Sequence, residues 1–265
     1  MFKVSCIQLR SSDDMKLNLK KTSNLILKAI KKKTDFIVTP ETSSYMSLEK
    51  KDLSKKISKI EKDTFCIGIK KIAKKYKKWI LIGSLITKNR NKQLVNRSIL
   101  INPNGKIVKY YDKIHMFDVK LNSREKYKES AIFKSGKKIK TFNLPWGKLG
   151  FSICYDLRFP NMYRQMAKVG CKFISVPSAF TETTGKKHWH TLLKARAIEN
   201  FCYIFAPAQA GKHTNGRKTF GHSLIVSPDG EIVKELKHNK EGFVSALINP
   251  ELPKKLRKII PSLNG

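Results

Sequence analysis

The stretch Gly150-Phe151-Ser152-Ile153-Cys154-Tyr155-Asp156-Leu157-Arg158-Phe159-Pro160 joins an apolar run to a cysteine that polar and charged residues follow at once. Residues 148–153 have the apolar, β-branched character of a buried strand, and Pro160 can open a helix that continues to residue 167. Cys154 therefore falls at a strand-to-helix turn, which presents a side chain outward and aims backbone N–H groups at what that side chain attacks. This makes Cys154 a candidate nucleophile, although a single cysteine is more often a small core residue.

Strands and helices alternate on both sides of this stretch, and their order occurs twice. The apolar patterns predict strands over 2–9, 35–39, 79–86, 148–153, 172–176 and 201–207, helices over 13–33, 53–77, 160–167 and 187–200, and hairpins of 94–101 with 107–111 and of 220–226 with 231–233. Two similar sheets, each with helices on one face, can bury their open faces against each other. We therefore expect an α/β fold, a four-layer α-β-β-α sandwich of two sheets with a pseudo-twofold internal repeat.

Two segments fall outside this repeat. The polar segment 112–135 has no clean period and is too long for an ordinary connection, which is typical of a functional loop. The last stretch, 253–265, is basic and carries one apolar row, Leu256, Ile259 and Ile260, which suits docking on a partner subunit.

Length and cysteine content favour an intracellular protein of one domain. With 265 residues and 40% hydrophobic content, the chain can form a single domain over residues 1–265. It contains no run of 18 apolar residues and begins directly with a strand pattern, so we expect no membrane partner and a cytoplasmic location. The five cysteines include no Cys-x-x-Cys pair, which argues against a disulfide framework and fits a reducing compartment.

The net charge of +35 raises the alternative of a nucleic-acid-binding protein that is not an enzyme. Only 9 of the 55 basic residues are arginines, whereas recognition of phosphates and bases favours the arginine fork. The lysines are scattered over predicted helix faces, so we expect no specific nucleic-acid partner. A zinc hydrolase is a further alternative, but His188-x-His190 alone is a weak ligand pattern, and we expect no metal site.

A cysteine nucleophile needs a base for its proton and a donor for the oxyanion that forms on attack. Glu41 follows the predicted buried strand 35–39 and Pro40, and Lys113 follows the second strand of the first hairpin. A carboxylate at the end of a buried strand is partly desolvated, which raises its pKa toward the range of a general base. Taken alone, however, Glu41 is typical of a turn residue and Lys113 is one lysine among many.

Together these blocks resemble a known family. Pro40-Glu41, then Tyr111-Asp112-Lys113-Ile114-His115-Met116-Phe117-Asp118-Val119, then the stretch from Ile153 to Pro160 resemble the three signature blocks of the carbon–nitrogen hydrolase (nitrilase) superfamily. The resemblance covers nearly the whole chain. It implies an αββα sandwich that pairs into a homodimer, and hydrolysis of an amide C–N bond by a Glu-Lys-Cys triad that needs no metal or organic cofactor.

The resemblance also implies a role for each matching residue. Cys154 is expected to be the nucleophile, Glu41 the general base and then acid, and Lys113 the group that stabilises the tetrahedral intermediate. The backbone N–H of Tyr155 is expected to complete the oxyanion hole. Glu129 matches a second glutamate that helps to position the lysine and the substrate.

The later segments resemble one branch of the family more than another. Residues 177–185, His188-Trp189 and the stretch 220–223 are similar to the branch that hydrolyses deaminated glutathione. The alternative is an ω-amidase acting on α-ketoglutaramate, because that branch shares the triad blocks.

Both substrates end in a γ-amide beside an α-keto acid, so an anion-binding group is required. Arg158 or a backbone nest near Thr183 and Thr184 could supply it. We expect Phe180 and Thr184 to contact substrate, and the segments 112–135 and 180–188 to line the mouth of the site.

Overall fold

The structure, a computed structural model, describes residues 1–47, 50–121, 123 and 125–263. In these residues, two six-stranded sheets form the body of the protein. The first sheet contains, in spatial order, β16 (Gly242–Ile248), β1 (Phe2–Gln8), β2 (Phe36–Val38), β3 (Trp79–Lys88), β4 (Leu94–Ile101) and β5 (Ile107–Asp112). The second contains β15 (Ile232–Glu235), β14 (Leu224–Val226), β11 (Tyr203–Ala206), β10 (Cys171–Ser175), β9 (Gly147–Phe151) and β8 (Thr141–Leu144).

The two sheets have the same plan, which confirms the predicted internal repeat. In the first, β1, β2 and β3 are parallel and β4 and β5 continue antiparallel. In the second, β9, β10 and β11 are parallel and β14 and β15 continue antiparallel. A sixth antiparallel strand lies beside the first strand of each set, β16 beside β1 and β8 beside β9. Because β16 follows the second sheet in the sequence and pairs with β1, the first sheet contains strands from both ends of the described chain.

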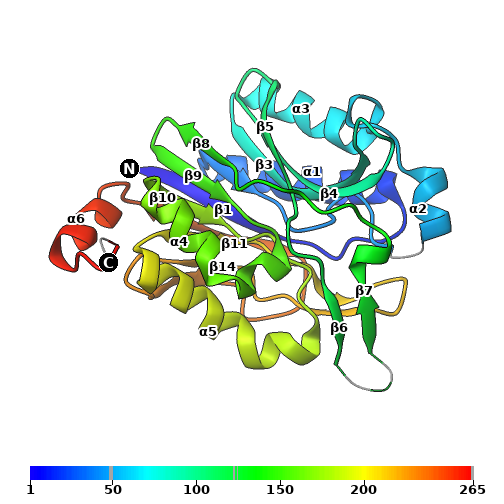
Figure 1. Cartoon of the computed structure of the whole chain (residues 1–265). Helices are drawn as coiled ribbons and strands as arrows, with labels where there is room; N and C mark the ends of the chain where they lie inside the picture. Colours follow the sequence, from blue (N-terminus) through cyan, green and yellow to red (C-terminus); the bar gives the residue numbers. More distant parts are fainter. Residues whose placement is uncertain (48–49, 122, 124, 264–265) are drawn as a thin grey trace.

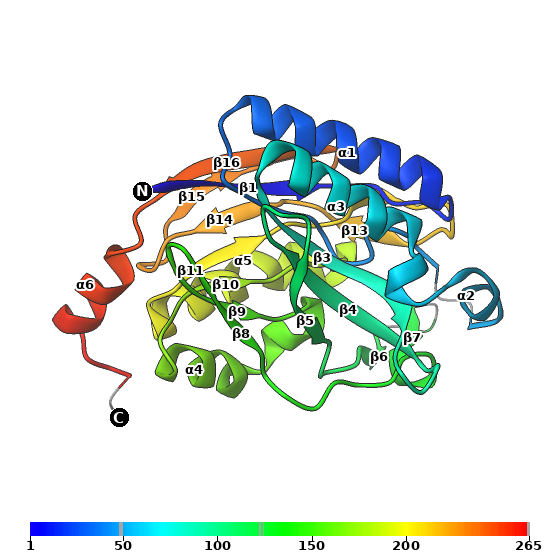
Figure 2. The same cartoon turned by 90° about the horizontal axis from the view of Figure 1, so that it is seen from above.

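Helices cover the outer face of each sheet (Figure 1). α1 (Met15–Lys31) and α3 (Thr64–Tyr76) lie on the first sheet, as the view from above shows (Figure 2), while α4 (Pro160–Lys168) and α5 (Glu182–Asn200) lie on the second. The short helix α2 (Lys50–Lys56) precedes α3, and α6 (Leu252–Ile259) projects beside the N-terminus. None of the helices in the described ranges is long and apolar enough to cross a membrane.

Alternating side chains of the first sheet separate two apolar layers. Val4, Phe36 and Leu81 belong to the cluster shared with the second sheet, whereas their neighbours Ile37 and Ile80 pack with α1 and α3. This period of two is the pattern of a strand that is buried on both faces. The predicted four-layer sandwich is therefore confirmed.

Several predicted boundaries were wrong. The single helix predicted over 53–77 is instead α2, a 3-10 turn (Ile60–Lys62) and α3, because the side chain of Asp63 accepts a hydrogen bond from Cys66 N and begins a new helix. α5 begins at Glu182, five residues before the predicted start, where the side chain of Thr181 caps its first turn.

Two hairpins outside the main sheets were not predicted as regular structure. Segment 112–135 contains β6 (Asp118–Lys120), β7 (Lys126–Lys128) and a 3-10 turn (Glu129–Ala131); its residues 122 and 124 lie outside the described residues. The second hairpin consists of β12 (Ala210–Lys212) and β13 (Lys218–Phe220). The strand predicted over 220–226 was therefore wrong in its first half, because the chain turns at Gly221 and His222, which both have positive φ, and β14 begins at Leu224. Residues 264 and 265, at the end of the predicted docking stretch, are also outside the described part of the chain.

Candidate active site

Cys154 lies at the predicted turn, three residues after the end of β9 and at the start of a 3-10 helix (Cys154–Arg158) that leads into α4. Its φ of 48° is in the left-handed region, which a residue with a Cβ rarely adopts, and its N–H donates to the carbonyl of Pro177 at 2.9 Å. Such backbone strain is concentrated at functional sites, where the surrounding structure holds it in place. Only 7% of Cys154 is exposed, so its thiol faces a nearly closed space.

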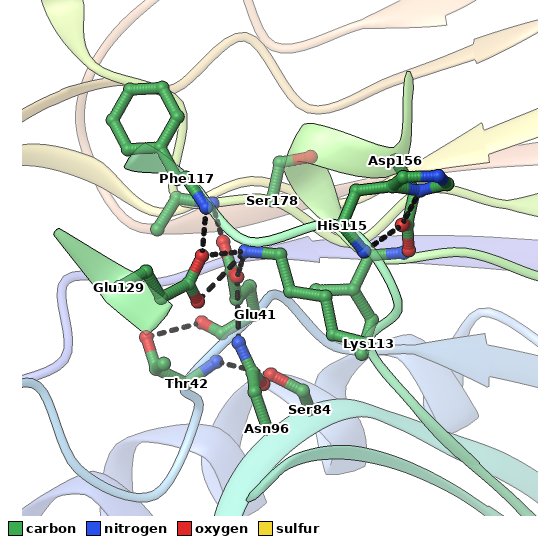
Figure 3. A network of polar contacts seen from close by, with 12 residues as sticks. Glu41, Thr42, Ser84, Asn96, Lys113, His115, Phe117, Glu129, Asp156 and Ser178 are labelled. Carbon is green, nitrogen blue, oxygen red and sulfur yellow. Dashed lines mark hydrogen bonds and ion pairs between the residues drawn. The ribbon is translucent and has the colours of Figure 1, made fainter. Parts of the chain in front are cut away.

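Glu41 lies three residues beyond β2, and its carboxylate is held from several sides (Figure 3). Oε1 accepts hydrogen bonds from Lys113 Nζ at 3.0 Å and from Asn96 Nδ2 at 2.9 Å, and Oε2 accepts one from the backbone N–H of Ala179 at 2.8 Å. The thiol of Cys154 lines the same cavity as this carboxylate. With 4% of Glu41 exposed, these partners fix both oxygens beside the thiol.

Lys113 bridges two carboxylates in the interior (Figure 3). Its ammonium lies 3.0 Å from Glu41 Oε1 and 2.7 Å from Glu129 Oε2, and only 2% of the residue is exposed. Glu129 Oε2 also accepts the backbone N–H of Phe117 at 2.7 Å, which ties the 3-10 turn of Glu129 to the segment after Lys113. A buried cation needs such partners, because its desolvation is otherwise costly.

The charges around the thiol set the direction of each pKa. Burial raises the pKa of Cys154, and the negative charge of Glu41 raises it further, while Lys113 and Arg217 offset this only in part. Burial opposes the charge of Lys113, but Glu129 and Glu41 outweigh it and hold the pKa of Lys113 above its usual range. In the resting site the proton therefore remains on sulfur, beside an ionised carboxylate.

The prediction that Glu41 has a raised pKa was wrong. Burial alone does raise it, but the positive charges of Lys113 and Arg217 and the hydrogen bonds from Cys154 and Lys113 outweigh burial, so the pKa of Glu41 is lowered. The sequence showed the end of a buried strand but not the cations that the fold brings to it.

A buried carboxylate, Asp156, joins the turn of Cys154 to the segment of Lys113 (Figure 3). Its Oδ1 accepts the backbone N–H of His115 at 3.1 Å, and its Oδ2 accepts the hydroxyl of Tyr111 at 2.7 Å and the N–H of Ile153 at 2.9 Å. Asp156 is completely buried. The nucleophile and the lysine are thus held in one network, although they are far apart in the sequence.

Close contact between strand ends shapes the floor of the site. Gly83 in β3 lies so near the end of β2 that a Cβ there would be 1.8 Å from the carbonyl oxygen of Thr39 and 2.5 Å from Pro177 Cβ. A glycine is required here by the approach of two chain segments. The same approach brings Glu41, two residues after Thr39, close to Pro177, whose carbonyl accepts the N–H of Cys154.

One cavity of about 230 Å³ brings the predicted site residues together. Its lining includes the eight residues singled out from the sequence, which are Glu41, Lys113, Glu129, Cys154, Tyr155, Arg158, Phe180 and Thr184. The lining also contains Phe117 and residues 126–129 from segment 112–135, and Thr181 and Thr184 at the N-terminus of α5.

The expected anion-binding groups lie at this cavity. The guanidinium of Arg158 is over the rings of Phe180, at 5.3 Å, and Tyr155, at 5.9 Å, and it contacts His188 Nδ1 at 3.2 Å. Thr184 is 8% exposed in the first turn of α5, whose N-terminal N–H groups favour an anion. The Thr183 hydroxyl instead donates to Glu125 of the first hairpin at 2.9 Å.

Sequence reasoning missed Asn96, Asp156 and Arg217. Asn96 and Arg217 line the cavity, and their importance depends on strands that meet only in the fold. Asp156 stands two residues after Cys154 in the opening stretch, where a charged residue beside a buried strand was the available signal.

A second cluster of polar side chains lies outside the cavity lining. His190 Nε2 and His222 Nδ1 are 2.9 Å and 2.6 Å from the same oxygen, Oε1, of Glu235. The three residues have metal-ligating atoms close together. The weak pattern His188-x-His190 is not the group that forms, because His188 faces Arg158.

Comparison with known proteins identifies the family of the chain. Residues 3–258 match the Carbon-nitrogen hydrolase family. The chain is 34% identical to the deaminated glutathione amidase of Dictyostelium discoideum, covering 97% of this chain and 91% of that protein. It is 33% identical to the omega-amidase NIT3 of Saccharomyces cerevisiae, covering 98% and 91%.

A solved structure shows the same fold. Saccharomyces cerevisiae Nit3, a member of branch 10 of the nitrilase superfamily, superposes with a TM-score of 0.87 at 28% identity, over 98% of this chain and 94% of that chain. The match to the family spans nearly all of the sequence and the fold is shared throughout. The chain therefore belongs to the carbon–nitrogen hydrolase family of the nitrilase superfamily and is a hydrolase that acts on amides.

Proposed function

We propose that this protein is an amidase in which Glu41, Lys113 and Cys154 form the catalytic triad and the reaction passes through a thioester on Cys154. One observation carries this proposal: the thiol, the carboxylate and the ammonium line one cavity, each on a residue that is at most 7% exposed, and Lys113 Nζ donates to Glu41 Oε1 at 3.0 Å. Glu129 is the positioning residue for Lys113, which it holds through both carboxylate oxygens.

The first half-reaction forms the thioester. Cys154 attacks the amide carbon while Glu41 accepts the thiol proton. The two events occur together, because the pKa of Cys154 is raised and the thiol keeps its proton until the attack, while Glu41 is ionised and can accept it. Lys113 and the backbone N–H of Tyr155 stabilise the oxyanion that develops on the former carbonyl. Glu41 then gives its proton to the leaving nitrogen as the C–N bond breaks.

The second half-reaction restores the thiol. Glu41 takes a proton from water, the hydroxyl oxygen attacks the thioester carbon, and the C–S bond breaks as the proton returns to sulfur. Each proton that Glu41 accepts is released in the same half-reaction, so no metal or organic cofactor is needed for the balance.

The substrate we favour is deaminated glutathione. The resemblance of segments 177–185 and 220–223 supports it, as does the similarity to a relative of that name. Arg158 and the N-terminus of α5 at Thr184 provide a place for the carboxylate next to the α-keto group. The alternative, ω-amidase action on α-ketoglutaramate, is supported by the similarity to the yeast omega-amidase.

Release of the amine from each amide tests the triad. Wild-type protein should cleave the favoured amide, and Cys154→Ala should abolish turnover without loss of fold, because the thiol contributes little volume to the core. Glu41→Gln and Lys113→Met should be nearly as inactive. The glutamine side chain cannot accept and return the proton, and the methionine thioether cannot stabilise the oxyanion. Wild-type activity in Cys154→Ala would exclude this mechanism.

Competition between the two amides tests the substrate. With both present, deaminated glutathione should be consumed faster, as measured by kcat/KM. Faster consumption of α-ketoglutaramate would instead establish the alternative.

The remaining expectations concern the setting of the enzyme. All five cysteines are unpaired, which fits the reducing cytoplasm we propose. The exposed apolar side chains of Ile259, the last residue of α6, and Ile260, which follows it, support a homodimer.

A further inference from the structure

Arg217 brings a second guanidinium to the cavity, from the β12–β13 hairpin, whereas Arg158 belongs to the 3-10 helix that follows β9. It follows the turn of the hairpin β12–β13, which is closed by hydrogen bonds from His213 N to Arg217 O at 2.9 Å and from Gly216 N to His213 O at 3.0 Å. The hairpin is attached to the cavity wall, because Phe220 N donates to Phe180 O at 2.9 Å. The position of Arg217 is therefore built into the fold.

The guanidinium of Arg217 is oriented by groups that carry no negative charge. Its Nη2 donates to the carbonyl of Ala179 at 2.6 Å, and its Cζ lies 5.2 Å from the ring centroid of Tyr127 in β7. Elsewhere, Arg97 and Arg196 pair with Asp112 and Glu199.

Arg158 and Arg217 differ from those two arginines. Among the described residues, neither forms an ion pair with a carboxylate, although both line the cavity. A guanidinium at a nearly closed cavity binds a carboxylate well, because the charged hydrogen bonds form away from water.

Arg217 is linked to Glu41, the proposed general acid, through the peptide of Ala179. Ala179 N donates to Glu41 Oε2 while Ala179 O accepts from Arg217. Burial raises the pKa of Glu41, and the positive charges of Lys113 and Arg217 lower it. In the proposed mechanism Glu41 protonates the leaving nitrogen, which puts the leaving group beside the peptide that Arg217 holds.

We propose that Arg217 binds a carboxylate on the leaving-group side of the substrate, so that the site takes amides with two carboxylates. This inference rests on the proposed amidase function and extends it. Arg158 receives the carboxylate on the acyl side, which stays on Cys154 in the thioester. An extended dipeptide amine reaches about 7 Å from its nitrogen, so the C-terminal carboxylate of a cysteinylglycine leaving group falls within range of a side chain beside Glu41.

The test compares deaminated glutathione with the same amide whose C-terminal carboxylate is replaced by a carboxamide. The ratio of kcat/KM for the acid to that for the carboxamide should be about 10 to 100 in the wild type and near 1 in Arg217→Met. Any effect of Arg217 on Glu41 itself applies to both substrates and cancels in the ratio. Lys218→Met, an exposed neighbour on the same hairpin, should keep the wild-type ratio.

Binding separates this inference from the proposed function. In the Cys154→Ala protein, the ratio of Kd values for the two amides, measured by calorimetry, should likewise collapse when Arg217→Met is added. If the wild type cleaves neither amide, the proposed function fails, and the Kd ratio still decides the role of Arg217. A ratio that Arg217→Met leaves unchanged, in turnover or in binding, would overturn the carboxylate site.

Discussion

We expect the protein to lose stability between pH 6.5 and 4 because of one buried side chain, His213. It is 3% exposed, its Nδ1 lies 2.8 Å from Ser11 O, and its Nε2 lies 2.7 Å from the Thr219 hydroxyl. Burial lowers the pKa of His213 from 6.5 to about 4; the hydrogen bond to Ser11 opposes this, and the nearby charge of Arg217 adds to it. The folded protein thus keeps His213 neutral where the unfolded chain protonates it.

The sign and size of the effect follow from proton linkage. Because the folded pKa lies below the unfolded one, the unfolded chain binds more protons between the two values, and stability falls as the pH is lowered through this window. The gap between a pKa of 6.5 and one of about 4 corresponds to about 3 kcal/mol of unfolding free energy. Above pH 6.5 the contribution of His213 to the free energy of unfolding is constant.

Urea unfolding of wild type and His213→Gln at pH values from about 7 to about 4 measures this term. The variant should be less stable at neutral pH, because it loses the contacts of the ring, and its disadvantage should shrink by about 3 kcal/mol toward pH 4. Exposed His238→Gln is the matched control and should follow the wild type throughout. A difference between wild type and His213→Gln that does not change with pH would refute the reasoning.

Three further predictions concern the packing around the site and the assembly. Asp156→Asn turns a side-chain N–H toward the backbone N–H of Ile153 or of His115, so it should lower the free energy of unfolding by about 3 kcal/mol and Tm by about 6–12 °C. The control Asp13→Asn changes an exposed side chain and should leave Tm unchanged; equal Tm values for the two variants would contradict the role of Asp156. Gly83→Ala places a methyl group 1.8 Å from the Thr39 carbonyl, so little folded protein should be recovered, and a wild-type yield and Tm would show that the strands can separate there. Light scattering should give twice the chain mass of 30.4 kDa for the wild type and the chain mass for Ile259→Lys, whereas a monomeric wild type would disprove the dimer.

Local patterns in the sequence were sufficient for most strands of the two main sheets and for the turn at Cys154. Apolar alternation identifies the main strands, and Pro160 after a short polar segment marks the start of α4. The helix over 53–77 was misjudged because its lysine-rich pattern continues across residues 57–63, and only the cap at Asp63 shows where α3 begins. Strand β16 was missed because it pairs with β1 at the opposite end of the chain.

The sequence by itself determined the repeat of strands and helices and, through family resemblance, the proposed triad residues Glu41, Lys113 and Cys154. Tertiary structure alone decided that Asn96 and Arg217 line the same cavity as these residues, that Asp156 joins their segments, and that the pKa of Glu41 is lowered where its strand end predicted the opposite. The physical reason is the range of the interactions. Hydrophobic period and turn chemistry act between neighbours in the chain, whereas the field at a buried carboxylate is set by charges that only folding brings within a few ångströms.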